Sequence, residues 1–387
     1  MRSRLHSAVA LACVAIVALT IGVYRFHHDH GDWSSDGAIY LRMTLQDRGE
    51  SVEDARRHAN AFMRTTAEAR EPLAAGFYTD APPEFYRTQY PLFRSRPLYP
   101  KLASYLYPRF GPDALKIVSA AAYVAAVVLM YLLLLFVAPP LLAAAGALAF
   151  AMTPAVLNVA ALPLTDELAL AAWIAALAVL LRYLRSGSRG WFAALIAVSL
   201  LLTFVRPAIY LPFGAALGAF FGTPRGSPQR TAAGRAAIAL VVVGIVFFAY
   251  TLAVHGPGIA DQLRWQYEWR VATHYSFAAH GFFVWWALTF ASAFAEELVV
   301  EAYRHNALFA IVLAIFGLIA MRGTLLAAVA LGSAAATIVA LVVNPTELPR
   351  TVTLPLTPVV ILLATIALGR ILSTLKPENV SGGARSA

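Results

Sequence analysis

The chain has 387 residues, of which 60% are hydrophobic and only 13% are charged. Soluble domains carry about 25% charged residues, so this composition excludes an ordinary water-soluble fold and indicates a polytopic membrane protein. The formal net charge of +9 does not indicate nucleic-acid binding, because many basic residues fall in short loops between apolar segments, where they set membrane orientation. The single cysteine, Cys13, cannot form an intrachain disulfide.

The first apolar segment, 7–24, follows Arg2 and Arg4 and is about long enough to cross a bilayer. It resembles a secretory signal, but no small-x-small cleavage site follows it. We therefore expect an uncleaved membrane anchor whose basic end faces the cytoplasm.

A long loop, 25–112, comes next, and we expect it outside the cytoplasm. "SVEDARRHANAFMRTTAEAR" begins with a capping arrangement of Ser51 and Asp54, and its apolar residues then recur at helical spacing. "RSRPLYPKLASYLYPRFG", which contains Arg96 and Lys101, has the pattern of a basic amphipathic helix on a membrane surface. Loops of this length without a role are uncommon. We favour a half-lid over a site at the membrane surface; a solvated cap is the alternative.

Nine more apolar segments suit membrane spans, which gives about ten with the anchor and an all-α polytopic membrane fold. A further segment, 281–300, carries Glu296 and Glu297, and we expect it to lie in the interface because acids in a lipid-facing span are costly. Whether it crosses the bilayer stays open. The nine segments are 113–137, 139–160, 164–184, 189–205, 207–222, 233–254, 306–322, 324–343 and 350–373.

The basic residues orient these spans. Arginine clusters within 182–189 and 225–235 place both connections in the cytoplasm. The first loop, the turn at 162–167 and the Arg206-Pro207 corner then face outward. The expected organisation is an anchor (1–24), the first extracytoplasmic loop (25–112), a helix bundle (113–254), interfacial helices (255–305), C-terminal spans (306–373) and a cytoplasmic tail (374–387).

Acidic side chains occur at two separate outward positions. Asp36 lies in "GDWSSDGAIYL", just past the anchor, with Tyr40 one turn further on. Asp166 and Glu167 lie in "ALPLTDELAL". Helix capping and the helix dipole are sufficient structural reasons for acids at such positions. The alternative is that they are carboxylates that accept a proton in a transfer reaction.

Two outward arginines are the basic counterparts of these acids. Arg206 lies in "FVRPAIYLP" and Arg350 in "NPTELPRTVTLPLTPVV". Each is an arginine on the outer side, where the positive-inside rule expects few basic residues. Snorkelling at the interface is one explanation; bidentate recognition of a phosphate is the other.

Other chemistries find less support in the sequence. The run "HHDH" at 27–30 has metal-binding residue types, but we favour an adventitious cluster because native sites draw ligands from separated elements. No Walker motif, HExxH or Ser-His-Asp arrangement is present. ATP-driven chemistry and zincin-type proteolysis therefore lose support.

Three stretches together resemble a known superfamily. They are "SSDGAIYL" after the first span, "TPAVLNVAALPLTDELALAAWIAALAVLLRYL", and "ELPRTVTLPLTPVVILLA". In their order and common outward placement they are similar to the GT-C superfamily of membrane glycosyltransferases, such as protein O-mannosyltransferases and lipid A aminoarabinose transferases. Many members carry two adjacent acids at the first position, whereas Ser35 precedes Asp36 here, so dependence on a divalent metal ion stays open.

The resemblance implies a bacterial cytoplasmic-membrane enzyme with an extracytoplasmic active face. The implied partners are membrane lipids, a polyprenyl-phosphate sugar donor and a glycan, lipid or protein acceptor, with no nucleic acid. The implied reaction is an inverting displacement. The rival functions are a transporter or flippase for a lipid-linked or anionic solute, and a non-catalytic assembly subunit. The resemblance implies that Asp36 is the catalytic base. It implies that Asp166 is the second acid, with Glu167 as its substitute. The residues implied to contact the substrate or its phosphate are Arg206, Arg350, Arg96, Lys101 and Tyr40.

Overall fold

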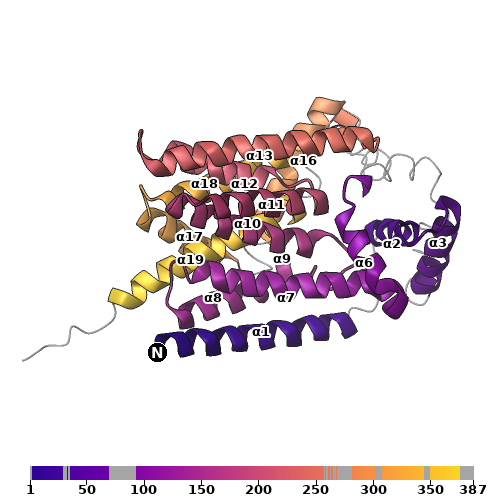
Figure 1. Ribbon diagram of the computed structural model, residues 1–387, viewed down its shortest axis with the longest axis horizontal. Helices are drawn as coiled ribbons and strands as arrows, with labels where there is room; N and C mark the ends of the chain where they lie inside the picture. The colour runs from indigo at the N-terminus through magenta and orange to yellow at the C-terminus, as the bar shows by residue number, and fades with distance from the viewer. Residues whose placement is uncertain are drawn as a thin grey trace, which may run out of the picture.

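The fold is seen in a computed structural model, and all regular structure in its described residues is helical (Figure 1). The described residues are 2–28, 33, 35–68, 93–256, 258, 260–261, 263–264, 267, 281–300, 307–343 and 349–374. The helices are α1 (Arg2–His28), α2 (Ser35–Asp47), α3 (Val52–Glu68), α6 (Leu98–Phe110), η1 (Gly111–Asp113), α7 (Ala114–Leu134), α8 (Pro140–Ala151), α9 (Pro154–Leu157), α10 (Asp166–Ser186), α11 (Arg189–Val205), α12 (Tyr210–Gly222), α13 (Pro228–Ala253), α16 (Phe282–Val299), α17 (Leu308–Ala320), α18 (Leu325–Val343), η3 (Pro349–Thr353) and α19 (Leu354–Thr374).

Six helical segments in the described residues are long and apolar enough to cross a membrane. This confirms an integral, helical membrane protein. The number of long helices is smaller than the predicted ten or so spans, because several predicted spans form shorter helices. The six are Leu5–His28, Leu98–Leu134, Asp166–Ser186, Pro228–Ala253, Leu325–Val342 and Leu354–Thr374. The shorter apolar helices are Pro140–Ala151, Arg189–Val205, Tyr210–Gly222, Phe282–Ser292 and Leu308–Ala320.

The apolar helices lie side by side along the long axis of the molecule (Figure 1). α2, α3 and α6 gather beyond one end of this bundle. α1 starts at the opposite end and runs along one edge, where it packs on α7 and α8. The C-terminal part of α19 also points to the end where α1 starts.

The first loop forms its own small core over the end of the bundle. Trp33, Tyr40, Met63, Tyr99 and Leu115 are among the buried side chains of this core. They join α2, α3 and α6 to the start of α7, so this part of the loop is a packed layer. η1 links α6 directly to α7, and the two form one long helical stretch through the predicted loop boundary.

The predicted cap of the loop helix is present. The Ser51 hydroxyl accepts a hydrogen bond from the Asp54 backbone N–H at 3.1 Å and donates one to the Asp54 carboxylate at 2.7 Å. The first of these bonds satisfies a backbone N–H that the first helical turn leaves open. α3 therefore begins at Val52, close to the predicted start.

The predicted single span over 139–160 is interrupted. α8 ends at Ala151, and α9 begins at Pro154. Proline disfavours helical backbone at the preceding residue and cannot donate an N–H bond. This explains the extended backbone of Thr153, which has ψ near 128°.

α12 and α18 pack through small residues. Gly214, Gly218 and Gly222 recur at four-residue spacing on α12 and face Ala328 and Gly332 of α18. A Cβ built on Gly218 would overlap the Ala328 carbonyl oxygen and lie 2.8 Å from Gly332 Cα. Such small-xxx-small spacing lets helix backbones approach closely in membranes. We call this contact the α12–α18 seam.

Candidate functional site

Four charged residues from four distant segments meet at the end of the bundle under the first loop. Asp36 comes from the first turn of α2, and Asp166 is the first residue of α10. Arg206 directly follows α11, and Arg350 lies in η3 before α19. Each segment carries its charge at a helix end, where the chain leaves the apolar bundle.

Asp166 is the centre of this group. Its side chain is 1% exposed. Oδ1 accepts hydrogen bonds from Arg206 Nη1 at 2.6 Å and Arg350 Nε at 2.9 Å, and Oδ2 accepts one from Arg350 Nη2 at 2.7 Å. The contact with Arg350 is therefore bidentate, the strongest geometry for an arginine and a carboxylate. A buried carboxylate needs this compensation.

Arg350 also reaches the first loop. Its Nη1 donates to Asp36 Oδ2 at 2.9 Å. The Asp36 side chain is 22% exposed, so it lies at the open edge of the group. Within the described part of the chain, Asp36 Oδ2 pairs with Arg350, and no residue pairs with Asp36 Oδ1. Asp36 thus keeps one oxygen available.

A close backbone approach brings Asp36 to this position. The next residue, Gly37, packs against Pro163 in the turn before α10. A Cβ at Gly37 would lie 2.8 Å from Pro163 Cγ and 3.2 Å from the Trp33 ring. Glycine is therefore required for α2 to dock this closely on the turn that leads to Asp166.

Tyr40 and Arg96 extend the group. Arg96 Nη1 donates to the Tyr40 hydroxyl at 3.3 Å, which is also 3.3 Å from Thr165 Oγ1. Thr165 immediately precedes Asp166. We call Asp36, Asp166, Arg206, Arg350, Arg96 and Tyr40 the charged cluster. It contains three guanidinium groups and two carboxylates, so these side chains carry one positive charge in excess.

Glu167 does not join the charged cluster. Its side chain is fully buried, and neither carboxylate oxygen has a hydrogen-bond partner among the described residues. Successive helical residues point about 100° apart, so Asp166 and Glu167 face different neighbours. A charge on Glu167 would be buried without a counter-ion, which is costly.

Lys101 also lies outside the charged cluster. Its Nζ is 3.8 Å from Asp47 Oδ1, and the Lys101 side chain is 45% exposed. Burial raises the pKa of the Asp47 carboxyl, and the charge of Lys101 opposes that shift. This pair links α6 to the end of α2. It therefore stabilises the packed first loop and not the charged cluster.

The cavity beside the charged cluster is small. It has a volume of about 20 Å³ and is lined by Asp166, Arg206, Tyr210 and Arg350 among others. This is about the room that one water molecule needs. A sugar cannot fit there, so substrate would have to approach at the partly exposed side of the cluster, where Asp36 lies.

The acids of the cluster do not form a metal site. Arg350 lies between Asp36 and Asp166 and occupies the oxygens that would face a cation. Among the described residues, no three His, Cys, Asp or Glu side chains are grouped to hold a metal ion. In the predicted histidine run, Asp29 and His30 lie outside the described residues. The residues present therefore do not fit a divalent ion at the cluster.

The sequence alone did not reveal the support behind the cluster. This support comes from Thr165, which bonds to Tyr40, and from Trp173. Trp173 Nε1 donates to the Pro355 carbonyl at 3.0 Å, which ties α10 to the start of α19 next to Arg350. A buried indole needs a partner for its N–H, but no sequence pattern shows that the partner is 182 residues away.

Comparison with protein-family models and with curated proteins finds no match for this chain. The site unites six of the eight residues that the sequence selected, and leaves Glu167 and Lys101 outside.

Proposed function

We propose that this protein is a membrane glycosyltransferase of the GT-C type, which moves a sugar from a polyprenyl-phosphate donor to an extracytoplasmic acceptor. One observation carries the proposal. Asp36, Asp166, Arg206 and Arg350 converge in one charged cluster at the rim of an apolar helix bundle. A lipid-linked donor presents its phosphate and sugar at that depth.

We also propose how the helix bundle is oriented in the membrane. The end that bears α2, α3 and α6 is extracytoplasmic, since the arginine-rich connections belong to the other end by the positive-inside rule. The shorter apolar helices complete about ten spans together with the six long ones. The membrane is the bacterial cytoplasmic membrane.

Asp36 is the general base in this proposal. Its partly exposed carboxylate accepts the proton of an acceptor hydroxyl while that oxygen attacks the anomeric carbon. The new C–O bond forms as the bond from the anomeric carbon to the phosphate oxygen breaks, and the electron pair leaves with the phosphate. A single in-line displacement inverts the anomeric centre. Positioned bases typically contribute ~10²–10⁴-fold.

The arginines stabilise the leaving phosphate. Arg206 and Arg350 are partly exposed, with 16% and 23% of their side chains accessible. The one excess positive charge of the cluster suits an anion, and fixed donors aimed at developing charge lower a barrier without reorganisation. Asp166 positions both guanidinium groups. Because its oxygens already accept three hydrogen bonds, Asp166 is a poor proton acceptor, and the base is Asp36.

A deletion strain tests the proposal. Mass analysis of its cell-envelope glycans should show a glycan, lipid or protein that lacks one sugar. The wild-type gene should restore that sugar, and Asp36→Asn at equal abundance should not. Restoration by Asp36→Asn would favour the transporter or assembly-subunit alternatives, which need no base.

A further inference from the structure

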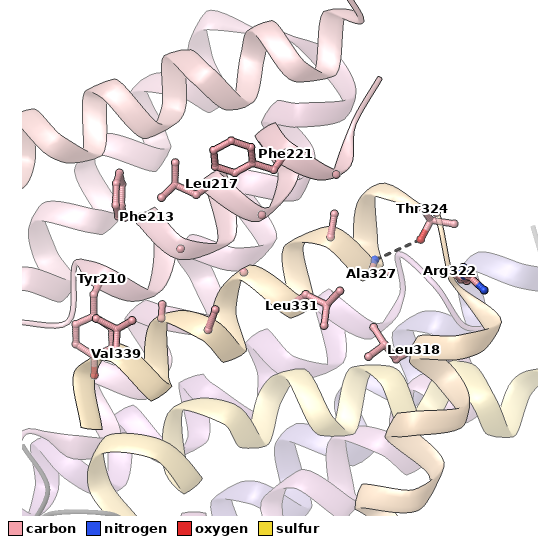
Figure 2. Close-up of a pocket in the computed structure, with 18 of the residues that line it drawn as sticks. Tyr210, Phe213, Leu217, Phe221, Leu318, Arg322, Thr324, Ala327, Leu331 and Val339 are labelled. Carbon is pink, nitrogen blue, oxygen red and sulfur yellow. Dashed lines mark hydrogen bonds between the residues drawn. The ribbon is translucent and has the colours of Figure 1, made fainter. Parts of the chain in front are cut away.

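An apolar groove runs along α12, α17 and α18 (Figure 2). Its volume is about 890 Å³, near the upper end of the roughly 300–1,000 Å³ of small-molecule sites. Phe213, Leu217 and Phe221 of α12 stand on one side, and Leu318 and Leu331 stand on the other. The groove suits a hydrocarbon chain.

The two ends of the groove differ. Tyr210 and Val339 lie at one end, and Arg322 and Thr324 lie at the other (Figure 2). Tyr210 also lines the small cavity beside Asp166, so its end adjoins the charged cluster. Among the described residues that line the groove, Arg322 is the only charged one. The charge is therefore at the end far from the candidate site.

Arg322 is available to bind an anion. It lies in the turn between α17 and α18, its side chain is exposed, and none of the described residues forms an ion pair with it. A second guanidinium reaches the same turn, because Arg370 Nη2 lies 3.6 Å from Met321 Sδ. The hydroxyl of Thr324 already bonds to Met321 and Ala327.

We propose that this groove binds an anionic phospholipid of the cytoplasmic leaflet, with its phosphate on Arg322 and one chain along α12. Arginine is a preferred partner of phosphate, and the positive-inside rule assigns this end to the cytoplasm. α12 has 13 residues and spans about 20 Å, more than half of the ~30 Å hydrocarbon layer. A chain from one leaflet therefore fits beside it.

The charge distribution favours this occupant over the chain of the sugar donor. The donor phosphate would lie at the charged cluster, at the opposite end, and its chain would then run toward the only charge in the groove. A cytoplasmic phospholipid matches both the charge and the apolar lining. This proposal does not depend on glycosyl transfer.

Native mass spectrometry of the purified full-length protein tests the headgroup contact. The probes are phosphatidylglycerol and diacylglycerol with the same chains, because diacylglycerol lacks the phosphate that Arg322 would bind. Wild type should retain phosphatidylglycerol about tenfold better, and Arg322→Gln should abolish that preference, because one charged hydrogen bond is worth about tenfold or more. Arg189→Gln, which removes an exposed charge outside the groove, should leave the preference intact.

A steric variant tests the position of the chain. Ala335 lines the groove and is exposed, so Ala335→Phe should fill the groove and remove the bound lipid. Ala249→Phe on the exposed side of α13 is the matched control. Every variant is first compared with wild type in unfolding temperature; if Ala335→Phe does not fold, the Arg322→Gln comparison decides.

Three outcomes would overturn the proposal. They are equal retention of both lipids by wild type, unchanged phosphatidylglycerol retention in Arg322→Gln, and retention that persists in a folded Ala335→Phe variant. A polyprenyl phosphate that displaces phosphatidylglycerol and depends on Arg206 instead of Arg322 would assign the groove to the donor chain.

Discussion

The charged cluster and the α12–α18 seam hold distant parts of the chain together by opposite means. In the cluster, Asp166 joins α10 to Arg206 and Arg350 through three charge-assisted hydrogen bonds. In the seam, Gly218 and Gly332 bring two backbones into contact without any polar side chain. The cluster is therefore sensitive to the loss of a single group, whereas the seam is sensitive to the addition of a single atom.

The largest expected effect is on the cluster. Asp166→Asn removes the carboxylate that pairs with both Arg206 and Arg350, and breaking a buried ion pair costs about 3–5 kcal/mol. Denaturant unfolding in detergent micelles measures this loss in the free energy of unfolding. Asp47→Asn, which removes the partly exposed partner of Lys101, should cost at most about 1 kcal/mol. Equal losses for the two variants would refute the assignment of Asp166 as the centre of the cluster.

Lysine variants separate the charge of the two arginines from their hydrogen-bonding geometry. Arg350→Lys keeps the charge but cannot bond Asp36 and Asp166 together, so we expect a loss of about 2–3 kcal/mol. Arg206 donates one hydrogen bond to Asp166, so Arg206→Lys should lose less than half as much. The same unfolding assay compares them. If both lysine variants are equally stable, charge alone holds the cluster together.

Addition of one methyl group tests the seam. Gly218→Ala forces α12 and α18 apart, because the new Cβ meets backbone atoms that cannot rotate away, and overpacking costs about 1–3 kcal/mol. Gly244→Ala on α13 is the control, since no atom lies within 4 Å of its Cβ position. That variant should be neutral or slightly stabilised by better helix propensity. Equal stability of the two variants would contradict close backbone packing at the seam.

We expect the smallest change in the free energy of unfolding for Glu167, the residue next to Asp166. Glu167→Gln should change the free energy of unfolding by less than about 1 kcal/mol, since Glu167 has no ionic or hydrogen-bonded partner to lose in the described structure. Thermal unfolding at several pH values measures it beside Asp166→Asn. A loss as large as that of Asp166→Asn would show that Glu167 has a charged partner.

The sequence predicted a helical membrane protein. It also predicted that Asp36, Asp166, Arg206 and Arg350 lie at the same end of the helices. Apolar segments and basic connections predicted most helices within a few residues, and the 189–205 helix matches its predicted bounds. The break before Pro154 was missed because window averages ignore a single proline within an apolar run. Proline chemistry explains it once α8 and α9 are seen.

The pairings within the site were not predictable. The sequence placed Arg350 near a substrate phosphate, but its bond to Asp166 joins residues 184 apart and depends on how α10 and α19 pack. The separation of Asp166 from Glu167 likewise depends on which face of α10 meets the first loop. Sequence spacing showed that both acids lie in the first turn, but not which one faces the arginines.

We propose that Asp36 accepts a proton during sugar transfer. It is tested by the rate of polyprenyl-phosphate release from an added polyprenyl-phosphate sugar donor in membranes of the deletion strain, which supply the acceptor, after expression of Asp36→Asn, wild type or Asp47→Asn. We expect Asp36→Asn to remain folded but to lose ~10²–10⁴-fold in rate, and Asp47→Asn to keep the wild-type rate. A normal rate in folded Asp36→Asn would contradict the claim.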